Sequence, residues 1–87
     1  VSSIASLDFQ FDAWGVDCSI AGSQKGFMLP AGLGILGMSE KALSRVATTR
    51  TPRSYFDLRP MIDQNSRGYF PYTPALSLMF GLDEALN

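Results

Sequence analysis

Histidine is absent from this sequence, and cysteine and lysine are scarce. The chain has 87 residues, among them one cysteine, Cys18, and two lysines, Lys25 and Lys41. Without histidine it cannot by itself supply a Ser-His-Asp or Cys-His catalytic arrangement, and most zinc sites are excluded as well. A single cysteine cannot form an internal disulfide, which fits a reducing compartment.

Charge is also low, and long apolar runs are missing. Charged residues make up 17% of the chain, against about 25% in an average domain. The net charge is -1 and no basic run occurs, so we predict no nucleic-acid partner. Apolar runs extend over only a few residues, so no membrane span is predicted. The 46% hydrophobic content indicates a globular chain with faces meant for burial.

The size and the two ends predict an excerpt of something larger. A chain of 87 residues is near the limit of independent stability. It opens on Val1 without a signal-peptide pattern, and it closes at Asn87 inside a helical pattern without a stop signal. We therefore expect both ends to be cut.

Strands and helices alternate along the chain. A buried strand is expected at 16–21 and a second strand at 32–38. Ser39 is typical of a helix N-cap, and an apolar stripe continues from it to residue 47. Further helices are expected at 54–62, interrupted by Pro60, and from Thr73-Pro74 onward, with a loop at 65–71 between them. The interleaving indicates the α/β class.

A glycine pattern imitates a dinucleotide site. Gly32-Leu33-Gly34-Ile35-Leu36-Gly37 matches Gly-x-Gly-x-x-Gly, with Asp57 near the place of the ribose-binding acid. That fingerprint needs a strand before it and a helix opening within it. Here Met28-Leu29-Pro30 precedes it and the glycines lie inside the apolar run, so we predict a glycine-containing strand.

Three aspartates, Asp8, Asp12 and Asp17, recur at intervals near four and could suggest a metal cluster. No glycine-punctuated calcium loop surrounds them, and aromatic residues lie between them. We predict loop and cap roles for these carboxylates, and no metal site. Cys18 is expected to be an inert, buried small hydrophobe.

Lys25 is the candidate for chemistry, since it follows the first strand and a Gly-Ser-Gln turn. Desolvation beside an apolar wall would favour the neutral amine that Schiff-base chemistry needs. A surface lysine with its stem on apolar residues is the commoner arrangement, and spacing alone does not decide between the two.

Two long segments resemble class V aminotransferases. They are Trp14-Gly15-Val16-Asp17, and Gly22-Ser23-Gln24-Lys25-Gly26-Phe27-Met28-Leu29-Pro30 with Gly32-Leu33, which resemble the cofactor-lysine segment. The closest likeness is to serine–glyoxylate and alanine–glyoxylate aminotransferases. Val1-Ser2-Ser3-Ile4 resembles the end of the preceding strand, and Tyr69-Phe70-Pro71-Tyr72-Thr73-Pro74, with Leu78-Met79-Phe80-Gly81-Leu82, resembles a later loop and helix.

The resemblance covers essentially the whole chain and implies its fold. Residues 1–87 would be part of the large, cofactor-binding domain of a fold-type-I aminotransferase, with no domain boundary inside them. That domain has a mainly parallel sheet flanked by helices.

The resemblance also implies a cofactor and its contacts. Lys25 would carry pyridoxal 5'-phosphate as a Schiff base and later move a proton. Gln24 would help to hold the cofactor phosphate, Val1 would pack on the pyridine ring, and Ser3 would be a polar residue of the same loop. The aspartate that pairs with the pyridine nitrogen, the N-terminal phosphate loop, the aromatic ring stacker and the substrate arginine are expected outside the chain.

A homodimer is implied as well. Tyr72 and Thr73 lie where the family reaches across the dimer interface to the other subunit's cofactor phosphate. Tyr69 is the alternative to Tyr72, because loop length varies there. The chain's own arginines do not match the family's substrate arginine; they are Arg45, Arg50, Arg53, Arg59 and Arg67.

The implied activity is transamination between an amino acid, serine or alanine, and glyoxylate or a related 2-oxo acid. A class V lyase or desulfurase relative is the first alternative; those enzymes usually carry a histidine where Gln24 stands, which favours transamination. A non-catalytic truncated domain is the second alternative. Members are cytoplasmic in bacteria and peroxisomal in many eukaryotes. We expect the chain alone to be inactive and to fold poorly.

Overall fold

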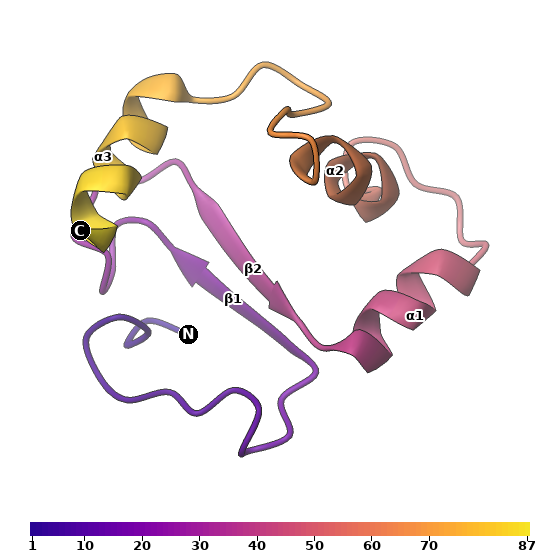
Figure 1. Ribbon diagram of the computed structural model, residues 1–87, viewed down its shortest axis with the longest axis horizontal. Helices are drawn as coiled ribbons and strands as arrows, with labels where there is room; N and C mark the ends of the chain where they lie inside the picture. Colours follow the sequence, from indigo (N-terminus) through magenta and orange to yellow (C-terminus); the bar gives the residue numbers. More distant parts are fainter.

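The computed structural model describes all residues 1–87, and its centre is a two-stranded hairpin (Figure 1). Strand β1 (Cys18–Gly22) pairs antiparallel with β2 (Gly34–Met38), and the register runs from Cys18 opposite Met38 to Gly22 opposite Gly34. The helices α1 (Glu40–Thr48), α2 (Leu58–Asn65) and α3 (Leu76–Leu86) follow in order.

The only strand pair of the chain is therefore antiparallel, whereas the resemblance implied a mainly parallel sheet. Residues 23–33 connect the two strands without a helix, whereas a parallel pair needs a crossover of about a dozen residues or more, usually helical. The glycines of the dinucleotide-like pattern lie before and within β2, as the prediction of a glycine-containing strand requires.

Strand β1 begins two residues later than predicted, and only Ala21 in it is buried. The amide of Val16 donates to the Phe11 carbonyl and closes a turn in which Gly15 has φ +66°, so the chain is not yet extended there. Cys18 and Ile20 are exposed, because no second layer covers the hairpin. The buried environment predicted for Cys18 is therefore wrong within this chain.

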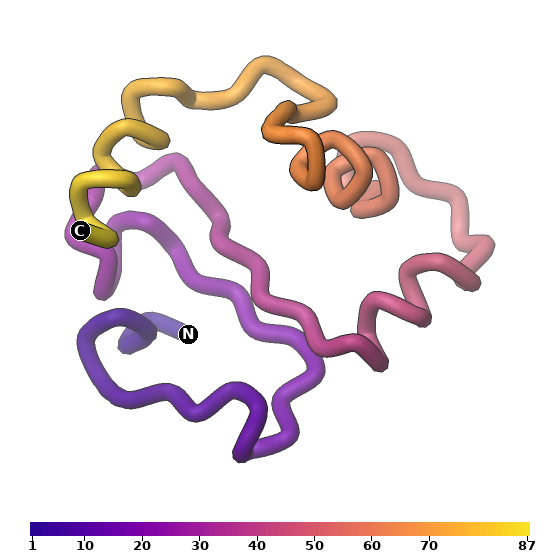
Figure 2. Tube along the Cα trace, in the orientation of Figure 1, coloured from indigo at the N-terminus to yellow at the C-terminus, as the bar shows by residue number.

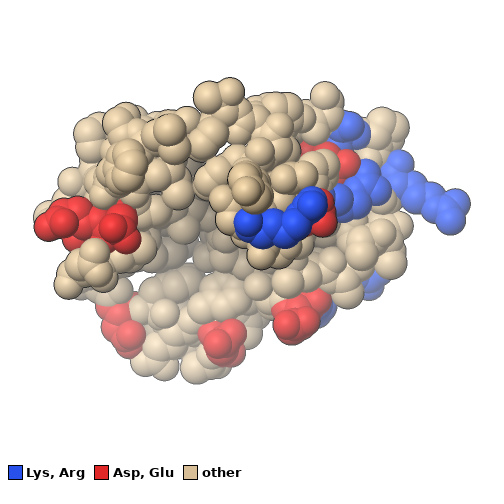
Figure 3. Space-filling view, turned by 45° about the horizontal axis from the view of Figure 1, so that its top comes forward, with Lys and Arg blue, Asp and Glu red and all other residues tan.

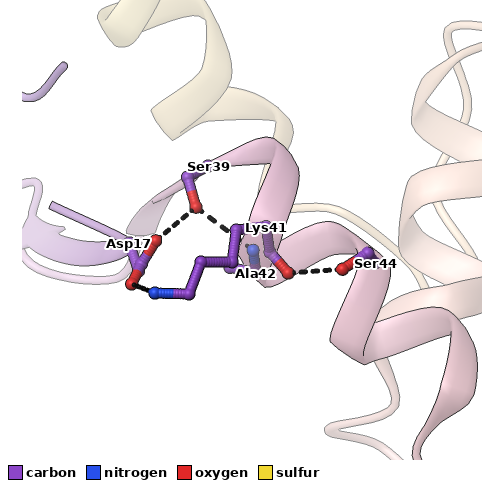
Figure 4. A network of polar contacts seen from close by, with 5 residues as sticks. All are labelled: Asp17, Ser39, Lys41, Ala42 and Ser44. Atoms are coloured by element: carbon purple, nitrogen blue, oxygen red, sulfur yellow. Dashed lines mark hydrogen bonds and ion pairs between the residues drawn. The ribbon is translucent and has the colours of Figure 1, made fainter. Parts of the chain in front are cut away.

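Helix α1 begins as predicted, and a polar network fixes its start to Asp17, the residue before β1 (Figure 4). The Ser39 hydroxyl accepts from the Ala42 amide at 3.1 Å and donates to the Asp17 carboxylate at 2.8 Å. The Lys41 ammonium binds the same carboxylate at 2.8 Å. These bonds, Lys41 first, lower the pKa of Asp17, and Asp17 in turn raises the pKa of Lys41. Asp17 thus has a structural role at the helix start.

The boundaries of α2 and α3 differ from the prediction. Pro60 does not interrupt α2, because it is the third helical residue, and the backbone N–H of a residue at that position has no carbonyl partner within the helix. Helix α3 begins at Leu76, since Ala75 is not helical (ψ 80°) and its carbonyl is the first to accept, from Leu78 and Met79. The predicted cap at Thr73 is therefore wrong, and α3 has no side-chain N-cap.

Little of the chain is buried. Only Ala21 and Ser23 are fully covered. In the trace of Figure 2, the hairpin, α1, α2 and the segment that leads to α3 form a rim, and these elements line a groove of about 600 Å³. Most of its lining is apolar, including Leu36, Met61 and Met79. None of the three helices has the length and apolar character that a membrane crossing requires.

Candidate functional site

The loop at 23–33, which carries Lys25, is held by several hydrogen bonds. The Lys25 amide donates to the Gly22 carbonyl at 3.2 Å, and its own carbonyl accepts from Met28 at 3.0 Å. Both backbone groups of Lys25 are thus held in a turn, while its side chain is exposed. The burial considered for the Lys25 side chain is therefore not supplied by this chain.

The root of the loop is closed by Ser23, which has no exposed surface. Its hydroxyl donates to the Pro30 carbonyl at 2.7 Å and accepts from the Leu33 amide at 3.1 Å. Its amide donates to the Leu33 carbonyl, and its carbonyl accepts from Leu29. One residue therefore joins the beginning of the loop to its end.

Gly26 brings the N-terminal turn against the lysine loop. A Cβ atom at this position would lie 1.9 Å from the Ile4 carbonyl oxygen, a distance that no side chain can occupy. The turn itself is closed by the Ser6 and Leu7 amides, which donate to the Ser3 carbonyl. This close approach requires glycine at residue 26 and sets residues 1–7 beside Lys25.

Helix α3 supports the same loop from another direction. A Cβ on Gly32 would meet the Leu78 side chain at 2.5 Å, and a Cβ on Gly81 would meet the Leu29 side chain at 2.7 Å. Gly32 has φ +143°, which side chains rarely adopt. The two glycines let the loop and α3 approach closely.

These contacts bring three predicted site residues to one hollow of about 300 Å³. Val1, Gln24 and Lys25 line it, together with Gly22 and Gly34, which leave space where side chains would otherwise stand. Lys25 supplies an amine, Gln24 an amide and Val1 an apolar surface. No carboxylate lines the hollow.

The donor set of this hollow fits an aromatic phosphate that carries an aldehyde, as pyridoxal phosphate does. An amine reacts with an aldehyde, an amide N–H can bind a phosphate oxygen, and an apolar side chain can cover one face of a ring. The absence of acidic groups also suits an anionic phosphate.

The other predicted site residues lie elsewhere. Ser3 is half-buried in the N-terminal turn and does not line the hollow. Tyr72 and Thr73 line the larger groove, where the ring of Tyr72 packs on that of Tyr55 with centroids 4.8 Å apart. Tyr69 is exposed and lines neither space.

Basic side chains are concentrated away from the hollow. Most of those visible in Figure 3 lie together at one end of the molecule, and the acidic ones lie mainly at the other end and along the lower edge. All five arginines fall within residues 45–67, and none lines the hollow. Arg59 and Arg67 form ion pairs with Asp57 and Asp63.

Asp57 caps α2 and does not resemble a ribose-binding acid. Its carboxylate accepts from the side chain of Arg59, at 2.6 Å in the closest contact, and from the Arg59 amide at 3.1 Å. These bonds, the side-chain one first, lower the pKa of Asp57 to about 2.

Sequence reasoning missed the two residues that place the lysine loop. Ser23 and Gly26 stand beside Lys25 in the motif, but their contacts are with Pro30, Leu33 and Ile4. Their adjacency to the lysine was the only available signal, because a single sequence does not reveal which residues the loop meets on closing.

The chain is similar to known aminotransferases along its whole length, although no protein-family model matches it. A serine–glyoxylate aminotransferase of Methylorubrum extorquens is 56% identical over 99% of this chain and 23% of its own length. An L-aspartate–glyoxylate aminotransferase of Paracoccus denitrificans is 54% identical over 95% of this chain and 21% of its own length.

A solved structure agrees. An aspartate aminotransferase of subgroup IV from Thermus thermophilus matches 99% of this chain with a TM-score of 0.86 and 36% identity, over 24% of that protein. The chain thus spans between a fifth and a quarter of the length of the proteins it matches. These matches confirm the predicted resemblance and fold class: the whole chain is similar to one segment of aminotransferases.

Proposed function

We propose that this chain supplies the cofactor-lysine segment of a pyridoxal-phosphate-dependent aminotransferase, with Lys25 as the lysine that binds the cofactor covalently. The observation that carries the proposal is the hollow that joins Lys25, Gln24 and Val1. An amine, an amide and an apolar surface are three of the groups that would hold this cofactor.

Each residue of the hollow has a distinct role in the proposal. When bound, pyridoxal phosphate draws electrons from the bond between the substrate α-carbon and its hydrogen. The Lys25 amine would be the base that takes the proton from the substrate α-carbon, and its protonated form would deliver that proton to the carbon of the cofactor that carried the aldehyde. Gln24 binds the phosphate, and Val1 covers one face of the ring. Ser3 supports the N-terminal turn through its carbonyl.

Glyoxylate is the proposed amino acceptor, because the names of the two most identical relatives described above include it. Serine or alanine is the proposed donor. The relative named for serine and the relative named for aspartate are almost equally identical to this segment, at 56% and 54%. Residues elsewhere in the enzyme must therefore set most of the donor preference.

A second subunit would complete the site. Tyr72 and Thr73 line the groove and not the hollow, so they are free to serve a neighbouring copy. The proposal places them against the cofactor phosphate of the partner, in a homodimer. Since the resemblance implies that the ring stacker and the substrate arginine lie outside residues 1–87, the chain alone is expected to have no transaminase activity.

The two lysines of the chain provide a matched test in the full-length protein. Lys25→Arg keeps the positive charge but removes the amine, because a guanidinium does not lose its proton in proteins. We expect transamination from serine to glyoxylate to fall by about 10³-fold or more. Lys41→Arg keeps the ion pair to Asp17 and should leave the activity unchanged. Equal activities of the two variants would overturn the proposal.

A further inference from the structure

Burial and hydrogen bonding in this chain are concentrated at the root of the lysine loop. Ser23 is the only buried polar residue, and Ser23 and Ala21 are the only buried residues of the chain. Every polar atom of Ser23 is bonded: amide, carbonyl and hydroxyl all have partners. A chain with almost no core has thus enclosed one hydroxyl, two residues before Lys25.

The Ser23 hydroxyl makes two hydrogen bonds that the backbone of the loop does not make. Pro30 has no N–H, so the strand-like pairing cannot continue through it. The Leu33 amide needs an acceptor, and the Ser23 hydroxyl oxygen is 3.1 Å away. The same hydroxyl donates to the Pro30 carbonyl at 2.7 Å, so it bridges two loop positions three residues apart.

We infer that Ser23 is a positioning residue for Lys25, and this inference rests on the function proposed above. Its hydroxyl holds the loop closed, so that the turn bearing Lys25 is fixed relative to the strand end at Gly22. A lysine that must reach one carbon atom needs such a fixed base, because small displacements reduce proton transfer strongly.

Backbone strain in the loop supports the same view. Met28 is held at φ +56°, a left-handed conformation that non-glycine residues rarely adopt, although its side chain is exposed. Such a conformation persists where surrounding bonds over-determine it, and the bond from Leu29 to the Ser23 carbonyl is adjacent. The backbone of the loop is therefore held in one conformation by its hydrogen bonds.

The test uses the full-length protein with Ser23→Ala and the matched control Ser44→Ala. Ser44 also donates to a carbonyl, that of Lys41, at 2.7 Å, but on the exposed face of α1. Hydrogen exchange of the Leu29 and Leu33 amides is measured in both variants, with kcat and KM for transamination to glyoxylate.

We expect Ser23→Ala to speed exchange of both amides by about tenfold or more. The Leu33 amide loses its partner, and the Leu29 amide is bonded to the carbonyl of the same residue, so it opens with the loop. We expect kcat to fall by about tenfold or more while KM changes little, because only proton transfer depends on the exact position of Lys25. Ser44→Ala should change neither quantity. A Ser23→Ala protein with unchanged exchange and unchanged kcat would overturn the inference.

Two further measurements keep the outcome clear. If Ser23→Ala does not fold, Ser23→Cys is used, because it fills the site with a group that bonds weakly; native exchange and native kcat in that variant overturn the inference. Borohydride trapping of pyridoxal phosphate on Lys25 is run on the unmodified protein. Trapping with unaffected Ser23 variants refutes only the positioning role, whereas absence of trapping refutes the proposed function.

Discussion

When residues 1–87 are expressed alone, the apolar groove stays uncovered. We predict that this isolated chain shows no cooperative unfolding transition. The folded form exposes 6614 Å² of surface for a mass of 9.5 kDa. A compact monomer of this mass exposes about 5,000 Å². The excess is therefore about 1,600 Å² by the same relation.

The energy associated with this excess is large. A little over half of a protein's surface is apolar, which gives about 900 Å² of apolar area left in water. At about 25 cal/mol per Å², this area corresponds to about 20 kcal/mol of burial that does not occur. The whole stability of an ordinary domain is only about 5–15 kcal/mol. The isolated chain cannot offset the deficit with a core of two residues.

Differential scanning calorimetry and amide exchange of the isolated chain provide the assay. We expect no unfolding peak and little protection of the amides in β1 and β2. A single cooperative peak with an enthalpy of about 60 kcal/mol, the value for a folded domain of this length, would refute the reasoning. Slow exchange of all the hydrogen-bonded amides of β1 and β2 would also refute it.

The remaining predictions concern the full-length protein. Gly26→Ala should destabilise it by roughly 2 kcal/mol or more, because the backbone must move away from the Ile4 carbonyl, whereas Gly34→Ala meets no atom within 4 Å; equal melting temperatures would contradict this. The folded pKa of Asp57, about 2, lies below its ordinary 3.8, so its contribution to stability is present above pH 3.8 and is lost as pH falls toward 2; an NMR titration with a midpoint near 3.8 would contradict this. Mixed dimers of Lys25→Ala and Tyr72→Phe subunits should regain about half of the native activity if Tyr72 acts across the interface, since one site is then intact; activity at about half the level of the Tyr72→Phe dimer would place that residue in its own subunit.

Local signals predicted part of the fold well. Ser39 followed by an acidic first turn marked the start of α1, and the structure confirms it together with an added bond to Asp17. The Thr73-Pro74 signal failed, since the chain stays non-helical through Ala75. Capping patterns identify candidate starts, but the backbone conformation of the next residues decides whether the helix begins there.

Burial and strand direction could not be predicted from the pattern. Residues 16–21 have the alternation of a buried strand, yet Cys18 and Ile20 are exposed because nothing in the chain covers the hairpin. An apolar pattern indicates that a strand is suited to burial. Within residues 1–87, few residues are placed so that they could bury this strand. The antiparallel pairing follows from the connection at residues 23–33, which contains no helix.

The candidate site was accessible mainly through resemblance. Motif likeness placed Lys25, Gln24 and Val1 together, and these three line one hollow. Composition and spacing gave no means to separate Lys25 from a surface lysine, and its side chain is indeed exposed in the chain alone. The roles of Ser23 and Gly26 depend on contacts that only the folded loop displays.

Reduction of the full-length protein with borohydride in the presence of pyridoxal phosphate, followed by peptide mapping, tests the central claim most directly. The account predicts a pyridoxyl adduct on the peptide that contains Lys25, and none on the peptide that contains Lys41. An adduct confined to another lysine, or no adduct in a folded protein, would contradict it.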